Sequence, residues 1–191
     1  FEHTTVDDTL DFFRALRFKL TSGIAARLEE SWTETHSRYD IENPALYENI
    51  REDGLTLLQL SKLSADVDAI SREYATAYRG VLEEIYPYLR DKITGFEDIE
   101  EGIVDTFLWA LSRHPDSLIA KKAGVSRAEQ VREMIHSALS NRDSEATIGE
   151  KLSMLERALG DEENRLNPGS TADLLSAGLL CRLLEMEYPH D

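Results

Sequence analysis

The stretch TLLQLSKLSADVDAISREYATAYRGVLEEIYPYLRD, residues 56–91, decides the fold class of this chain. Its apolar residues recur at steps of three and four, which places them on one face of a helix. They are Leu57, Leu60, Leu63, Val67, Ile70, Tyr74, Tyr78, Leu82 and Ile85. The stretch therefore predicts a long helix from Thr56 to about Asp91. Pro87 is expected to kink or end this helix, because proline has no amide hydrogen to donate.

The same periodicity continues on both sides of this stretch. It predicts further helices over about 6–20, 24–32, 44–53, 99–113, 126–140, 148–159 and 171–187. Thr5 and Asn43 are expected to cap two of them, and Ser126 with Glu129 forms the pattern of a capping box. β-branched residues never alternate over a run, so no strand is predicted. The sequence predicts an all-α fold, an irregular bundle of about seven or eight helices.

Length and charge narrow the class of protein. The chain has 191 residues, which fits a single domain over residues 1–191 without a boundary. It carries 21 Lys and Arg against 37 Asp and Glu, a formal net charge of −16. This excess of acid disfavours nucleic acid and membrane partners, whose phosphates need clustered cations. Cys181 is the only cysteine and no apolar run is long enough to span a bilayer, so a cytoplasmic protein is expected.

One break between predicted helices reads His114-Pro115-Asp116-Ser117-Leu118-Ile119-Ala120-Lys121-Lys122. Pro115 followed by Asp116 is typical of a helix start, where amide groups attract anions. Lys121 and Lys122 follow about one turn later. Two interpretations stay open. The break is a phosphate site, or Asp116 simply caps the helix and the lysines are solvated.

A second break reads Asn167-Pro168-Gly169-Ser170-Thr171-Ala172-Asp173 and precedes an apolar helix. Ser170 or Thr171 can cap that helix, and Asp173 falls in its first turn. Because such a helix must bury most of its surface, these polar groups are expected to face an interior or a cleft. A ligand site and a capped helix end both remain open. The stretch is not a P-loop, because it lacks the G-x-x-x-x-G-K-[ST] pattern.

A third candidate is the pair Asp68 and Arg72, which lie four residues apart. A surface ion pair worth about 0.3–0.5 kcal/mol explains this spacing. A magnesium ligand at Asp68 with a phosphate clamp at Arg72 is the alternative. The five histidines show no metal-ligand spacing, and no H-E-x-x-H motif is present.

Five stretches in a fixed order carry a resemblance to a known family. They are Thr5–Ala15, Arg38–Ile41, Asp68–Tyr74, His114–Lys122 and Asn167–Leu174. In this order they resemble the triphosphoribosyl-dephospho-coenzyme A synthase family, particularly its archaeal members. The similarity spans nearly the whole chain and matches the C-terminal portion of the family's enzymes.

The resemblance implies an all-helical transferase with ATP as sugar donor. Adenine leaves C1 of the ATP ribose, and the ribose 2′-hydroxyl of 3′-dephospho-coenzyme A attacks there. The product is the precursor of a lyase prosthetic group. Such chemistry needs cations and Mg²⁺ for the triphosphate and a base for the hydroxyl. ATP and Mg²⁺ are therefore the expected substrate and cofactor.

The resemblance also assigns roles to residues of this chain. Asp116 and Asp173 are expected to act as general base or Mg²⁺ ligand, in an order left open, and Asp68 is a further expected Mg²⁺ ligand. The residues expected to bind substrate are His114, Ser117, Lys121, Lys122, Arg72, Asn167, Gly169, Ser170 and Thr171. These roles require the helix starts near Pro115 and Pro168 to open into one shared hollow.

The chain also departs from the family pattern. It begins at Phe1 rather than Met, and the family's Lys-Pro-Gly stretch and its glycine- and asparagine-rich ligand loop have no counterpart. The chain is therefore expected to be the C-terminal portion of a longer enzyme, with a preceding segment or a second polypeptide completing the site; a homo-oligomer is possible. Two alternative functions stay open: a related nucleotide-dependent transferase acting on another cofactor precursor, and a non-catalytic helical binding or assembly module.

Overall fold

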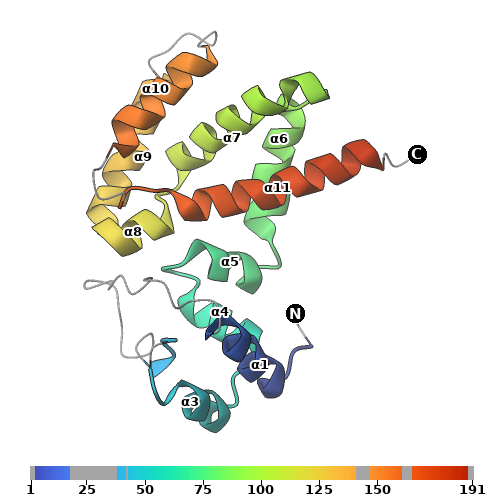
Figure 1. The fold of residues 1–191 in the computed structure, drawn as a ribbon, viewed down its shortest axis with the longest axis vertical. Coiled ribbons are helices and arrows are strands. Elements are labelled where there is room, and N and C mark those ends of the chain that lie inside the picture. Colours follow the sequence, from blue (N-terminus) through green and yellow to red (C-terminus); the bar gives the residue numbers. More distant parts are fainter. Residues whose placement is uncertain (1–2, 18–37, 42, 141–146, 161–164, 189–191) are drawn as a thin grey trace. The chain divides into compact units, whose positions relative to one another are not determined.

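The computed structural model describes residues 3–17, 38–41, 43–140, 147–160 and 165–188 (Figure 1). These residues form ten α-helices, one π-helical turn and one 3-10 turn, and no strand occurs among them. The all-α prediction is confirmed, with more helices than the seven or eight expected. The helix predicted over 24–32 lies outside the described residues. No described helix is both long and apolar enough to cross a bilayer.

The contacts within the chain separate into two compact units, Phe1–Ala77 and Tyr78–Asp191. The first unit holds α1 (Val6–Arg17), α3 (Leu46–Asp53), α4 (Leu57–Ser64) and α5 (Ala69–Ala75). Its buried core consists of Leu10, Leu46, Ile50 and Leu60. Thr5 caps α1 as predicted, because its hydroxyl accepts a hydrogen bond from the Asp8 amide at 3.2 Å.

The long helix predicted over 56–91 is wrong, because the structure breaks it into separate segments. At the first break Asp68 adopts an extended backbone, and its carboxylate accepts a hydrogen bond from the Ser71 amide at 2.6 Å. A side chain that binds a nearby amide competes in this way with the helix ladder. At the second break, Ala77 and Tyr78 adopt left-handed backbone angles, with φ of 55° and 61°. The spacing of apolar residues predicts neither the cap at Asp68 nor the left-handed backbone at Ala77 and Tyr78.

A π-helical turn, η1 (Val81–Ile85), leads into α6 (Tyr86–Lys92). The Tyr86 amide donates to the Val81 carbonyl, five residues earlier. Pro87 follows directly and has no amide to donate, and its ring crowds the carbonyl four residues back. A widened turn relieves that clash. The predicted disruption at Pro87 takes this form.

The rest of the second unit comprises η2 (Phe96–Asp98), α7 (Ile99–Arg113), α8 (Ser117–Ala123), α9 (Val125–Ser140), α10 (Ile148–Leu159) and α11 (Gly169–Glu187). Helix α7 packs against α6, α9, α10 and α11 (Figure 1). The largest buried cluster consists of Leu108, Leu111, Ile119, Ala128, Val131, Ile135, Met154, Ala158 and Leu166. Four helices thus surround α7, so a side chain on α7 can meet partners from several segments.

The capping box predicted at Ser126 is wrong. Helix α9 begins at Val125, so Ser126 lies within its first turn. The Gly124 carbonyl accepts hydrogen bonds from the Arg127 and Ala128 amides instead. Gly124 has a φ of 93°, which an L side chain rarely adopts, and this turn starts the helix early. Glu129 is consequently available to bind Arg132.

Gly178 allows α11 to approach η1 and α6 closely. A Cβ atom at this position would lie 2.7 Å from Ile85 Cγ2 and 3.1 Å from Leu89 Cδ1. We expect Gly178→Val to lower the free energy of unfolding by about 1–3 kcal/mol, because the buried side chains cannot move aside without strain. Urea unfolding measures this change. The matched control is Gly149→Val on α10, where a Cβ would meet nothing within 4 Å. Equal stability of the two variants would contradict the expectation.

Candidate functional site

Asp116 joins the starts of α8 and α11. One carboxylate oxygen, Oδ1, accepts hydrogen bonds from the Leu118 amide at 2.8 Å and the Ile119 amide at 3.0 Å. The other, Oδ2, accepts from the Thr171 amide at 2.7 Å and the Thr171 hydroxyl at 2.8 Å. The residue is only 2% exposed. Asp116 therefore caps α8 and holds a helix start that lies 55 residues further along the chain.

A pair of serines adds a second link between the same helix starts. The Ser117 and Ser170 hydroxyl oxygens lie 2.8 Å apart, and Ser170 Oγ also accepts from the Leu118 amide at 3.1 Å. Gly169 permits this close approach, because a Cβ there would lie 2.5 Å from Leu118 Cδ2. We call the group Asp116, Ser117, Gly169, Ser170 and Thr171 the α8–α11 junction.

The junction shows whether the two breaks, 114–122 and 167–173, meet and whether Asp116 caps a helix. The two helix starts do meet (Figure 1). They meet through the protein's own carboxylate and hydroxyl groups, which already accept hydrogen bonds from the first amides of α8. The capping interpretation of Asp116 is thereby confirmed. An anion cannot use those amides unless Asp116 leaves them.

Three charged residues near the junction have side chains without a partner in the described ranges. Lys121 and Lys122 are half-buried in the last turn of α8, and Asp173 is exposed in the first turn of α11. No hydrogen bond or ion pair within those ranges engages any of the three. Asn167 is also exposed, and its carbonyl accepts from the Gly169 amide at 2.9 Å. These side chains can interact with a ligand without first breaking a described contact.

Asp68 and Arg72 lie in the first unit, whereas the junction lies in the second. Asp68 caps α5, and Arg72 Nε donates to the Ala65 carbonyl at 3.0 Å. The pair therefore does not form the ion pair expected from its spacing. Its predicted contribution to the site stays a prediction.

The described ranges contain no preformed Mg²⁺ site made of protein side chains alone. No group there of three or more His, Cys, Asp or Glu side chains has the arrangement that a metal ion needs. Asp116 accepts four hydrogen bonds, and such a carboxylate has no lone pair to spare for a cation. Mg²⁺ commonly binds to substrate phosphates and one or two carboxylates while keeping its waters. These residues fit a Mg²⁺ ion that enters bound to the phosphates of ATP, rather than one held by the protein alone.

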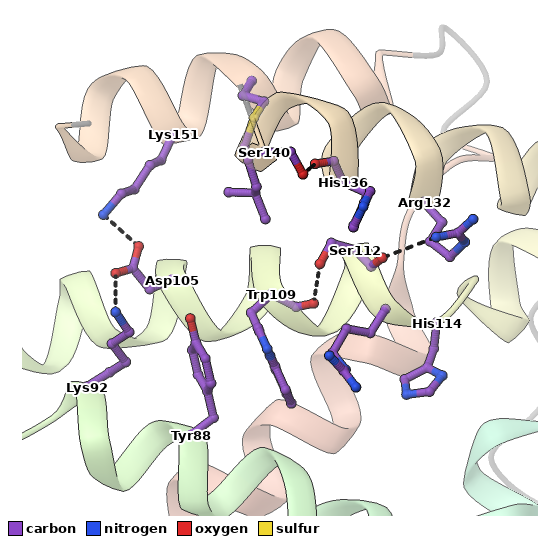
Figure 2. Close-up of a pocket in the computed structure, with 13 residues that line it drawn as sticks. Tyr88, Lys92, Asp105, Trp109, Ser112, His114, Arg132, His136, Ser140 and Lys151 are labelled. Carbon is purple, nitrogen blue, oxygen red and sulfur yellow. Dashed lines mark hydrogen bonds and ion pairs between the residues drawn. The ribbon is translucent and has the colours of Figure 1, made fainter. Parts of the chain in front are cut away.

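A cavity of about 670 Å³ lies between α6, α7, α9 and α10 (Figure 2). It is lined by Tyr88, Lys92, Asp105, Trp109, Ser112, Arg113, His114, Arg132, His136, Leu139, Ser140, Lys151 and Met154. His114 is the single predicted site residue among them, and it lies two positions before Asp116. The cavity therefore adjoins the junction along the chain. Sequence reasoning missed the rest of the lining, because its cations come from four helices and share no linear motif.

Asp105 holds two lysines at one end of the cavity. Its carboxylate lies 2.6 Å from Lys151 Nζ and 3.7 Å from Lys92 Nζ, as Figure 2 shows by dashed lines. Lys151 also pairs with Glu101 at 3.0 Å. Burial opposes the charge of Lys151, but the hydrogen bonds to Asp105 and Glu101 outweigh it and raise the pKa of this amine. Lys151 is therefore positively charged at neutral pH.

An aromatic pair lies against the same cavity. The rings of Tyr88 and Trp109 are stacked, with centroids 4.3 Å apart and an interplanar angle of 15°. The Arg113 guanidinium lies 5.3 Å from the centroid of the Trp109 ring, and Lys92 Nζ lies 5.6 Å from that of Tyr88. Burial, with a smaller contribution from the Asp105 charge, raises the pKa of the Tyr88 phenol. The phenol is therefore a neutral hydrogen-bond donor at physiological pH.

Fold, junction and cavity define an all-helical protein with a cavity that four cations and one carboxylate line. The family model for ATP:dephospho-CoA triphosphoribosyl transferases (CitG) matches residues 1–191, and the chain belongs to this family. The resemblance seen in the sequence is thereby confirmed, and the chain is a transferase that uses ATP.

A solved structure shares the fold. It comes from Archaeoglobus fulgidus and is assigned as a triphosphoribosyl-dephospho-CoA synthase. The TM-score is 0.68 at 21% sequence identity, over 96% of this chain and 68% of that chain. At this identity the similarity concerns the fold alone. No curated protein matches the chain.

Proposed function

We propose that this chain transfers the triphosphoribosyl group of ATP to the ribose 2′-hydroxyl of 3′-dephospho-CoA, and that the acceptor is activated beside the α8–α11 junction. The bond between C1 of the ATP ribose and adenine breaks, and a bond from C1 to the 2′-oxygen forms. Adenine leaves with the electron pair, and the proton lost by the hydroxyl balances the charge on adenine. One observation carries the proposal: two of the five motifs of the family resemblance, His114–Lys122 and Asn167–Leu174, meet at the junction.

Asp173 is the carboxylate best suited to accept the hydroxyl proton. Asp116 is buried with four donors and has no acceptor capacity to spare, and Asp68 caps α5 in the first unit. Asp173 is exposed and engages no described side chain. It follows Thr171 by two residues, and Thr171 is fixed to Asp116. The junction thus holds the base in position without consuming its lone pairs.

Asp116 acts in this proposal as a positioning residue together with Ser117, Ser170 and Thr171. These four side chains set the distance between the starts of α8 and α11. Gly169 is the first residue of α11 and Asn167 precedes it, and the exposed side-chain amide of Asn167 is available there to ligand oxygens. The residues of the junction and Asn167 orient the two substrates, so that the 2′-hydroxyl lies close to C1 of the ATP ribose.

The lysines of α8 supply positive charge for the substrate phosphates. Lys121 and Lys122 pair with no acid in the described ranges, so their ammonium groups are available to an incoming phosphate oxygen. His114 links this region to the cavity lining. Positive charge matters here, because an overall charge of −16 repels a triphosphate at long range. Arg72 remains a proposed phosphate contact from the first unit.

Incubation of the full-length protein with MgATP and 3′-dephospho-CoA is expected to release free adenine. The measurement is liquid chromatography for adenine, with mass spectrometry for a product equal to both substrates minus adenine. A 2′-deoxy analogue of the acceptor is the matched control and should give no product, because it lacks the attacking oxygen. Failure to release adenine with 3′-dephospho-CoA, while ATP still binds, would contradict the proposed acceptor.

A further inference from the structure

The cavity between α6, α7, α9 and α10 concentrates positive charge in an acidic chain. Lys92, Arg113, Arg132 and Lys151 line it together with the carboxylate of Asp105, while Glu101, Glu129 and Glu133 pair with Lys151 and Arg132 from outside the lining. The whole chain, by contrast, carries a formal charge of −16. Charges that line a hollow of low dielectric focus the electric field and raise the local concentration of the opposite ion. The cavity therefore favours an anionic ligand.

Arg113 is the cation most available to such a ligand. Arg132 and Lys151 already pair with carboxylates. Arg113 has the Trp109 ring beside it and pairs with no acid within the residues that the structure describes. A guanidinium presents two parallel N–H groups that match two oxygens of one phosphate. A phosphate bound here would gain a charge partner without displacing a described ion pair.

The stacked pair of Tyr88 and Trp109 offers a second kind of contact. Both residues line the cavity (Figure 2). Each ring covers one face of the other, and Arg113 lies over the Trp109 ring and Lys92 over the Tyr88 ring. A base can therefore stack on the outer face of Trp109 once Arg113 turns away from it. Aromatic side chains bind nucleobases by stacking, which tolerates any base because every base has a π-face. The ligand class that fits both features has a flat ring and a phosphate group.

We propose that this cavity binds an adenosine 5′-phosphate moiety, with Arg113 turning from the Trp109 ring to a phosphate and the adenine taking its place against Trp109. A volume of about 670 Å³ falls within the usual range for small-molecule sites. The inference rests on the proposed function, because ATP and 3′-dephospho-CoA both contain this moiety. It identifies the cavity as the place where one of the two substrates is held.

Fluorescence of Trp109 tests the proposal directly. The chain has two tryptophans, so the full-length protein is prepared with Trp32→Phe and any tryptophan outside this chain also replaced by Phe. Titration with ATP or with 3′-dephospho-CoA is expected to change the Trp109 emission. Arg113→Gln should raise the Kd at least about 10-fold, since a charge-assisted phosphate contact is lost. Arg157→Gln is the matched control, because Arg157 is exposed on α10 and donates to the Ser153 carbonyl, outside the cavity lining.

The two titrations also distinguish the source of the moiety. An Arg113-dependent response to ATP assigns the cavity to the donor, and one to 3′-dephospho-CoA assigns it to the acceptor. Inorganic triphosphate that binds as tightly as both nucleotides would overturn the stacking half of the proposal. Equal Kd values for Arg113→Gln and the unchanged protein would overturn the whole.

Failure of this inference differs from failure of the proposed function. Arg113-dependent nucleotide binding without adenine release would leave the cavity assignment standing and reject the proposed reaction. Normal adenine release, with unchanged KM values for both substrates in Arg113→Gln, would reject the cavity assignment and keep the reaction. Circular dichroism of each variant checks that the helices are intact.

Discussion

Replacing Asp173 with asparagine is expected to lower kcat for adenine release by about 10²–10⁴-fold, the usual contribution of a positioned general base. Asparagine keeps the size of the side chain but cannot accept the proton of the 2′-hydroxyl. The substrates should still bind with nearly unchanged KM, because the substitution removes an interaction needed in the transition state. Steady-state kinetics with 3′-dephospho-CoA as the varied substrate measures this difference.

The control for Asp173→Asn is Glu187→Gln, at the other end of α11. Both positions are exposed, so neither change should alter the stability of the helix by more than about 0.5 kcal/mol. Glu187→Gln is expected to keep full activity. If Asp173→Asn also kept it, Asp173 would not be the base.

Replacing Asp116 with alanine is expected to lower the free energy of unfolding by about 3–5 kcal/mol. The change removes a helix cap and four hydrogen bonds and leaves the Ile119 and Thr171 amides and the Thr171 hydroxyl without their acceptor, while the Leu118 amide keeps Ser170 Oγ. Each unsatisfied buried donor costs about 1–3 kcal/mol, which dominates the total. Urea unfolding measures the loss as a shift in the midpoint with an unchanged slope.

Thr171→Val provides a milder test of the same contact. It removes the hydroxyl that donates to Asp116 but keeps the Thr171 amide and the shape of the side chain. The expected loss of stability is about 1–2 kcal/mol. Asp173→Ala serves as the control that should unfold like the unchanged protein. A stability of Asp116→Ala equal to that of Asp173→Ala would show that the junction does not stabilise the second unit.

The sequence located most of the helix ends but not the internal breaks. The helices around His114-Pro115 and Gly160 end where the residues predict, because proline and glycine act on the backbone within a few positions. The break at Asp68 went unpredicted, because a capping aspartate competes with a continuous apolar stripe. Ser126 shows the opposite error, since its cap pattern is real but the turn at Gly124 starts the helix first.

The two candidate motifs were identified from sequence, but what their polar groups do was not. Two interpretations were open for Asp116 in the sequence, ligand binding and helix capping. The structure shows that it does the second, and that it also reaches Thr171. Asp173 looked similar in sequence, yet it remains exposed. Residue type alone cannot separate the two, because the difference lies in which donors the fold brings within hydrogen-bond distance.

Periodicity, charge and the order of five short motifs determined the helical class and the family of this chain. These properties are local or additive, because each residue contributes to them independently of its tertiary contacts. Tertiary structure alone decided that Asp116 also accepts hydrogen bonds from Thr171, 55 residues away, and that cations from four helices line one cavity with Trp109. Those outcomes depend on contacts between segments that are distant in sequence, and residue spacing along the chain does not predict such contacts.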